Sequence, residues 1–181
     1  MQVFDKNFKE ILTSQIVSII GGLIAGTILA LYTNNLLLLP GILIILPGLL
    51  EMRGNISGSF ASRLSSGLFL GVVNPNKIKT KIVRGNVIAS FLSTIILSLV
   101  LGFIAFLFTF FVSQAIIINI VLLPLFAGIV ANAIEIPLTL FTTFYFFKKG
   151  HDPNNIMGPF VTSIGDLTTI ISLLIGFVIL L

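Results

Sequence analysis

The sequence predicts an all-α integral membrane protein with five transmembrane helices, and three observations support this fold class. Of the 181 residues, 56% are apolar and only 9% are charged, and the mean hydropathy is +1.17. An ordinary soluble domain is about 25% charged, so a water-soluble fold of this length could not bury so much apolar surface. Apolar stretches long enough to span a bilayer recur along the chain, and the few basic residues lie between them.

The expected spans are placed by length, because a spanning helix needs about 20 mostly apolar residues. They run approximately over residues 11–32, 36–73, 87–112, 115–147 and 159–181. A short polar turn, Thr33–Asn35, separates the first two. The second stretch is too long for one straight span and is interrupted by Glu51–Asn55. We therefore expect the second helix to be broken at this point.

Orientation in the membrane follows from the basic residues of the short loops. One such loop, between the second and third spans, carries Lys77, Lys79, Lys81 and Arg84, and another, between the fourth and fifth, carries Lys148 and Lys149. Lys and Arg are in excess in cytoplasmic loops, and in a five-span layout both loops fall on the same side as the N-terminus. We expect a multi-pass protein of the cell membrane with its N-terminus in the cytoplasm and its C-terminus outside.

The domain organisation follows from the same layout. Residues 1–10 are expected to form a short cytoplasmic segment that is retained, because the apolar run after it suits a spanning helix better than a cleaved signal peptide. Residues 11–181 are expected to form one five-helix transmembrane domain. The chain has no convincing internal repeat, whereas many transporters consist of two related halves with a site between them. This suggests that the second half comes from another copy of the chain.

Several classes of function are excluded by composition and motifs. The chain has no Cys, so disulfides and thiolate metal sites are unavailable. Its formal net charge is +4, but the basic residues are too dispersed for a nucleic-acid interface. We find no HExxH motif, no aspartate pair suited to intramembrane proteolysis and no Ser/His/Asp set. We therefore expect neither an enzyme nor a nucleic-acid partner.

Asp166 is the strongest candidate site residue. In the expected fifth span it lies on the order of 10 Å inside the cytoplasmic end, and no Lys or Arg is within one helical turn of it in the sequence. An ionised side chain near the bilayer centre is costly, so such a group normally faces a pore or a partner. Thr162 and Thr169 share its face at i−4 and i+3. A carboxylate with neighbouring hydroxyls suits a hard cation, while the alternative is a protonated Asp bonded to another helix.

The expected break in the second span is the next candidate. Gly54 allows non-standard backbone conformations and Asn55 tolerates them, so backbone carbonyls freed here could bind a cation. The alternative is a plain loop between two short helices. Glu51 and Arg53 could neutralise each other or a neighbour, and Arg63 is expected to face inward or to extend towards the cytoplasmic surface.

Glu135 lies inside the expected fourth span, one turn after Asn132 and just before Pro137. A second cation ligand would explain this carboxylate. A structural partner for Arg53 or Arg63 would explain it equally well, and the residue types leave both alternatives open.

Asp152 precedes the expected fifth span in the turn Asp152–Asn155. It could simply initiate the turn. It also precedes Asp166 by almost four helical turns, so a helix that begins early would place both carboxylates on related faces. His151 is interpreted as a solvated loop residue.

Two stretches of the sequence, 47–65 and 152–166, resemble the two signature regions of the MgtE-type magnesium transporters. The segments Gly54-Asn55 and Ala61-Ser62-Arg63-Leu64-Ser65 are most similar to the eukaryotic solute-carrier branch, whose chains contain two such halves; this chain resembles one half. The resemblance implies a homodimer with a central pore lined by the second and fifth helices. It also implies that Asp166 is the central Mg²⁺-binding aspartate, that Asp152 lies at the cytoplasmic mouth and that Gly54-Asn55 lines the pore. Bacterial members carry a cytosolic Mg²⁺-sensing domain, and the short segment before the first span gives no expectation of such gating here.

The predicted function is transmembrane transport of divalent cations, most of all Mg²⁺, through a pore at a homodimer interface. The alternative is a non-conducting membrane subunit that assembles with another protein. We expect no prosthetic group, and Mg²⁺ or Mn²⁺ as the bound and transported ion, because oxygen ligands favour these ions over softer ones. The partners expected are the cation, the lipid bilayer and a second copy of the chain. The candidate metal ligands are Asp166, Asp152, Gly54, Asn55, Thr162 and Glu135, and the candidate pore-lining residues are Glu51, Ser59, Thr169 and Asn155.

Overall fold

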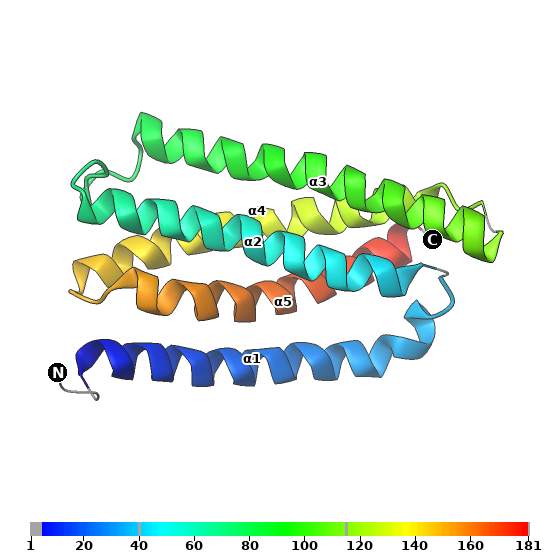
Figure 1. Ribbon diagram of the computed structural model, residues 1–181, viewed down its shortest axis with the longest axis horizontal. Coiled ribbons are helices and arrows are strands. Elements are labelled where there is room, and N and C mark those ends of the chain that lie inside the picture. The colour runs from blue at the N-terminus through cyan, green and yellow to red at the C-terminus, as the bar shows by residue number, and fades with distance from the viewer. Residues whose placement is uncertain (1–4, 40, 115, 181) are drawn as a thin grey trace.

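The computed structural model describes residues 5–39, 41–114 and 116–180, and in these ranges the chain forms five α-helices (Figure 1). They are α1 (Lys6–Leu36), α2 (Ile42–Phe69), α3 (Lys81–Ser113), α4 (Asn119–Lys148) and α5 (Pro153–Leu180). The all-α fold class predicted from the sequence is confirmed.

The helices lie side by side along one direction and alternate in sense (Figure 1). Helix α2 packs against α3, α4 and α5, and α4 also packs against α3 and α5. Helix α1 is peripheral and packs mainly against α5. The loops that carry the basic residues lie at the same end of the bundle as the start of α1 (Figure 1), where Lys6 donates a hydrogen bond to the carbonyl of Gly150.

Polar side chains cap the N-termini of three helices at this end. Asp5 accepts from the backbone N–H of Phe8 at 2.9 Å at the start of α1, and Thr80 accepts from Val83 at 3.3 Å at the start of α3. Asp152 accepts from the backbone N–H of Asn154 at 2.9 Å just before α5. Each contact satisfies a backbone donor that has no partner within its own helix.

Helix α5 begins six residues earlier than the expected Pro159, at Pro153. A proline is well suited to the first position of a helix, because its missing N–H would have no helical partner there. The longer helix places Asp166 near the middle of α5, about 20 Å from either end at 1.5 Å per residue. Asp166 is therefore about twice as far from the start of its helix as the sequence predicted.

The predicted break of the second helix is wrong, because α2 is continuous from Ile42 to Phe69. Gly54 does not adopt a positive φ angle, and the Asn55 side chain donates to Glu51 Oε1 one turn earlier, at 3.0 Å. This i, i+4 contact satisfies both polar groups without unwinding the backbone. The predicted turn at Thr33–Asn35 is also helical, and the chain reverses after Leu36 instead.

The outer surface of the bundle is apolar. Four helices of the described ranges, α1, α3, α4 and α5, are long and apolar enough to cross a membrane. The side chains of α1 are largely unburied, with Leu31 75% exposed. An apolar helix exposed in this way is suited to lipid rather than water. Helix α2, which carries Glu51, Arg53 and Arg63, is not among these four.

Candidate functional site

A layer of polar side chains crosses the interior of the bundle between two apolar clusters. One cluster gathers around Leu49, Leu123 and Leu173, and the other around Phe60 and Ile136. The buried polar residues that lie between them along α2, α4 and α5 include Arg53, Ser57, Asn132, Glu135 and Thr169. Polar groups buried at this depth need partners within the protein, so their contacts define the site.

The centre of this polar layer is an ion pair between Arg53 of α2 and Glu135 of α4. Arg53 is 0% exposed and Glu135 is 2% exposed. Ser57 donates to the other carboxylate oxygen of Glu135 at 2.7 Å, and the Thr168 hydroxyl lies 3.5 Å from Oε1. Of the two roles left open for Glu135 by the sequence, the structure supports that of a partner for Arg53.

Asp166 of α5 is the second carboxylate close to Arg53. The Arg53 Nη2 atom lies 3.5 Å from Asp166 Oδ1, although no basic residue is near Asp166 in the sequence. The Asp166 side chain is 27% exposed, whereas Glu135 is buried. One side of the Asp166 carboxylate therefore faces the guanidinium, and the other is accessible from outside the bundle.

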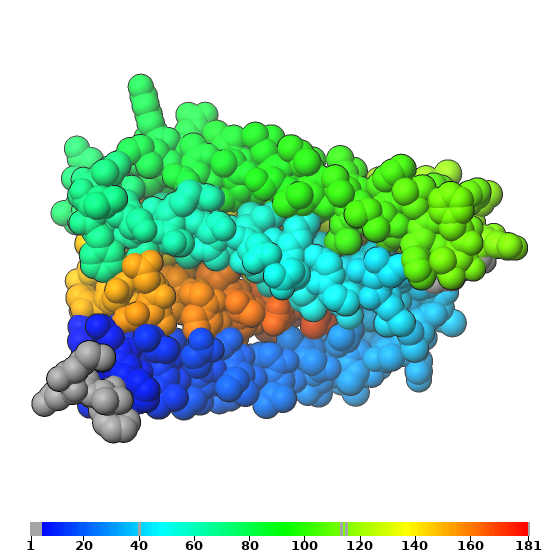
Figure 2. Space-filling view, in the orientation of Figure 1, coloured from blue at the N-terminus to red at the C-terminus, as the bar shows by residue number. Residues whose placement is uncertain are grey.

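Asp166 opens into a groove of about 560 Å³ between α2 and α5. The groove is lined by Pro47, Leu50, Glu51, Gly54, Asn55, Gly58, Gly158, Thr162 and Asp166. Figure 2, in the orientation of Figure 1, shows α5 at the surface as a strip between α1 and α2. The groove is wide because Gly54, Gly58 and Gly158 have open space where a Cβ atom would lie.

The groove presents oxygen atoms of the kind that hard cations prefer. They come from the carboxylates of Glu51 and Asp166, the Asn55 amide and the Thr162 hydroxyl, which itself donates to the Gly158 carbonyl at 3.1 Å. In the described part of the chain no three His, Cys, Asp or Glu side chains are grouped to enclose a metal ion. Carboxylate, amide and hydroxyl oxygens are the ligands that Mg²⁺ and other hard cations bind, Mg²⁺ with much of its water retained.

Five of the predicted site residues, Glu51, Gly54, Asn55, Thr162 and Asp166, lie in this groove. The reason given for Gly54 as a ligand does not hold, because backbone carbonyls inside a continuous helix accept from the residue four positions later. Gly54 contributes space instead. Thr169 does not line the groove: it is fully buried, and its hydroxyl has no hydrogen-bond partner among the described residues.

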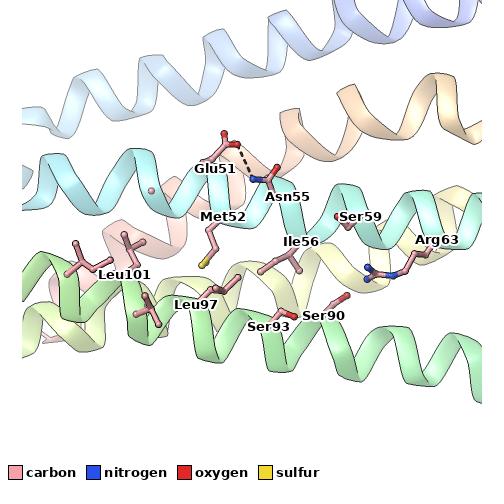
Figure 3. Close-up of a pocket in the computed structure, with 13 residues that line it drawn as sticks. Glu51, Met52, Asn55, Ile56, Ser59, Arg63, Ser90, Ser93, Leu97 and Leu101 are labelled. Atoms are coloured by element: carbon pink, nitrogen blue, oxygen red, sulfur yellow. Dashed lines mark hydrogen bonds between the residues drawn. The ribbon is translucent and has the colours of Figure 1, made fainter.

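Ser59 lies in a different cavity, of about 490 Å³, between α2 and α3 (Figure 3). Met52, Ile56 and Arg63 point from α2 towards α3 in this view, and the Arg63 Nε atom donates to Asn86 Oδ1 at 2.7 Å. Ser59 and Asp166 are therefore not in the same hollow. A residue on the expected pore-lining helix belongs to the groove only if it lies on the side that faces α5.

Asp152 and Asn155 lie at the basic end of the bundle, away from the groove lining. The Asn155 side chain donates to Glu10 Oε2 at 3.2 Å, and His151 Nδ1 lies 2.8 Å from Glu10 Oε1. Glu10 thus links α1 to the start of α5, which the sequence did not indicate. His151 has a specific partner and is not merely a solvated loop residue.

Four further residues line the groove without having been predicted as site residues: Pro47, Leu50, Gly58, which the sequence indicated only as part of the expected break, and Gly158. Helical spacing could have found the glycines: Gly54 and Gly58 are four apart on α2, and Gly158 is four before Thr162 on α5. The expected break hid the first of these pairs. Gly165 was also missed; a Cβ atom there would collide with Arg53 Nη1 and Glu135 Oε1, so α5 approaches the ion pair through this glycine.

Comparison with known proteins gives a family match that includes the groove residues. The sequence model of the MgtE family, described as divalent cation transporters, matches residues 46–176. The chain is also 28% identical over 192 residues to Solute carrier family 41 member 2 of Gallus gallus. That match covers 97% of this chain and 32% of the relative, so the chain spans about a third of the length of that protein. No solved structure is significantly similar. The MgtE family match covers most of the bundle, including most of both groove helices, α2 and α5. MgtE proteins are transporters rather than enzymes. The chain is a multi-pass membrane protein that belongs to the MgtE family of divalent cation transporters.

Proposed function

We propose that this chain transports divalent cations across the membrane along the α2–α5 groove, with Mg²⁺ as the principal substrate. The observation that carries the proposal is Asp166, a partly exposed carboxylate near the middle of a membrane-length helix. A charge at that depth is costly unless it serves a pathway or a partner. Arg53 alone does not account for it, because Arg53 already pairs with Glu135. Membership of the MgtE family supports the same assignment.

The ions are held through water and a few oxygen ligands. Asp166 supplies the charge, while Thr162 and Asn55 supply neutral oxygens on the facing walls. A groove of about 560 Å³ has room for an ion with part of its hydration shell. Mg²⁺ gives up its water reluctantly and binds to one or two carboxylates. Mn²⁺ shares the preference for oxygen ligands and is the natural second substrate.

A second copy of the chain closes the pathway. The groove is open on one side, and an ion in it would otherwise face lipid, where polar groups are not satisfied. Two-fold pairing of identical subunits is the commonest form of assembly and would bring two α2–α5 grooves together. Asp152, at the start of α5, then stands at the mouth of the pathway on the side of the basic loops. Those loops lie in the cytoplasm.

Flux measurements with a matched neutralisation test the transport proposal. The purified protein is placed in liposomes that contain a Mg²⁺-sensitive dye, and uptake is compared for the wild type, Asp166→Asn and Asp5→Asn. Asp5→Asn removes one carboxylate charge outside the groove and keeps a good helix cap. We expect uptake by the wild type and Asp5→Asn and none by Asp166→Asn. A wild type that passes no cation, while remaining folded, would instead favour a non-conducting subunit.

The dimer is tested separately by oxidative cross-linking in membranes. The chain has no native cysteine, so Leu50→Cys places a single thiol in the groove lining. Leu31→Cys, on the exposed side of α1, is the control. A cross-linked dimer is expected for Leu50→Cys and not for Leu31→Cys. The reverse pattern would place the dimer contact on α1 and contradict a shared groove.

A further inference from the structure

Arg53 is the one cation in the described part of the chain that forms ion pairs with two carboxylates from different helices. It contacts Glu135 of α4 and lies 3.5 Å from Asp166 of α5. With both carboxylates ionised, one positive charge faces two negative charges, and the group as a whole carries one net negative charge. What matters for a cation site is which of the two carboxylates uses the guanidinium.

The contacts favour Glu135 as the principal partner. Glu135 is held on both oxygens, since Ser57 donates to Oε2 at 2.7 Å and Thr168 lies 3.5 Å from Oε1. Arg53 is 0% exposed and cannot turn to water. Removing one partner of a buried ion pair leaves an uncompensated charge, which is strongly unfavourable. A buried guanidinium without Glu135 would therefore bind to the nearest remaining carboxylate, which is Asp166.

Gly165 keeps these groups within reach of one another. Because it has no Cβ atom, Arg53 Nη1 and Glu135 Oε1 approach the backbone of α5 directly beside Asp166. The distance from Arg53 to Asp166 is therefore short enough for a change of partner with only a small movement of the side chain.

We infer that Glu135 is a positioning residue for the cation site: by neutralising Arg53 it keeps the charge of Asp166 available in the groove. Glu135 does not line the groove, so it acts through Arg53 and not as a cation ligand. The inference rests on the proposed function, because it assumes that Asp166 binds the cation. It predicts that charge balance, rather than Glu135 itself, is what the site requires.

Two substitutions separate this role from a merely structural one. In Glu135→Gln the shape is nearly unchanged, but Arg53 is left with Asp166 alone and cancels its charge. In the double variant Arg53→Gln/Glu135→Gln both buried charges are gone and Asp166 is again unpaired. A merely structural role predicts that Mn²⁺ binding in each variant rises and falls with its thermal stability, because removing both partners of a buried ion pair is often less destabilising than removing one. Charge balance predicts rescue.

The test measures Mn²⁺ binding to the purified wild-type and variant proteins by the electron paramagnetic resonance signal of free Mn²⁺, with thermal unfolding recorded alongside. We expect Glu135→Gln to weaken binding at least about tenfold, which corresponds to about 1.4 kcal/mol. Arg53→Gln/Glu135→Gln and Glu135→Asp, which keeps the charge, should bind within about threefold of the wild type. Glu10→Gln, a neutralised glutamate at the end of the bundle, is the matched control and should bind as the wild type does.

The possible results distinguish a failure of the Glu135 inference from a failure of the proposed transport function. Wild-type affinity in Glu135→Gln overturns the inference, and so does a double variant that binds as weakly as Asp166→Asn. If Glu135→Gln does not fold, the double variant alone decides, because strong binding without Arg53 and Glu135 shows that neither residue is itself a cation ligand. A wild-type protein that binds no Mn²⁺ overturns the proposed function itself, and the inference with it.

Discussion

Arg53 on α2 and Asp166 on α5 are 113 positions apart in the sequence, and their side chains lie 3.5 Å from each other in the folded chain. Arg53 brings a fixed positive charge to the inner side of the groove, while the outer side of Asp166 remains open. In the proposed function, a cation that enters the groove meets the carboxylate of Asp166, which competes with Glu135 for Arg53. The affinity of the site depends on how firmly this arrangement is held.

Gly165→Ala should disturb that arrangement. The new methyl group would overlap Arg53 Nη1 and Glu135 Oε1, so either α5 moves outward or the ion pair opens. Overpacking of this kind costs about 1–3 kcal/mol, which lowers the melting temperature of a chain of this length by several degrees. Thermal unfolding and Mn²⁺ binding measure the two effects. Gly26→Ala, on α1 with open space at the Cβ position, is the control: it should leave Mn²⁺ binding unchanged and should not lower the melting temperature.

Enlarging Gly54 should block the groove without unfolding the protein. A Cβ atom at Gly54 meets nothing within 4 Å, and replacing a mid-helix glycine by alanine favours the helix by up to about 1 kcal/mol. Melting temperatures of Gly54→Ala and Gly54→Leu should therefore not fall below that of the wild type. Mg²⁺ flux should fall progressively from glycine to alanine to leucine as space is lost. Gly22→Leu on α1, also in open space, should keep full flux; equal flux in Gly54→Leu would show that ions do not pass this face of α2.

Asp152→Asn should reduce flux in part, and less so at high salt. Asp152 lies at the start of α5, about 21 Å along the helix from Asp166, so it acts on ions at the mouth through its field. Salt already shortens such fields to about 8 Å at physiological ionic strength. Asparagine keeps the cap on the Asn154 N–H, so the helix start is preserved. Flux is measured over a salt series, with Asp166→Asn for comparison. Complete loss at every salt concentration would contradict a role at the mouth.

Labelling of single cysteines should locate the two ends of the bundle. Asn76 and Leu38 are exposed in connections at opposite ends, and the absence of native cysteines leaves no background. With the basic loops inside, Asn76→Cys should react with a membrane-impermeant maleimide only after the membrane is opened. Leu38→Cys should react on intact cells. The opposite pattern would invert the proposed orientation.

Much of the architecture was predictable from the sequence because it depends on local properties. Spans need a minimum apolar length, and basic residues between apolar runs mark the loops, so the five-helix layout required no knowledge of packing. Asp166 stood out for a similar reason, as a charge within an apolar run. The resemblance to the MgtE family, carried by two separated stretches of sequence, is confirmed by the family match over residues 46–176.

Contacts between helices were decided by the tertiary structure. Glu135 could have been a ligand or a partner, and only the packing of α2 against α4 showed its ion pair with Arg53. Helix rotation likewise put Ser59 in the cavity facing α3 and Gly54 in the groove facing α5. The continuity of α2 through Gly54 and Asn55 also escaped the sequence, since local preferences for turns lose to hydrogen bonds and packing along the whole helix. Sequence patterns report what each segment needs from its surroundings, whereas the choice of partner depends on which helices lie side by side and which faces they turn to each other.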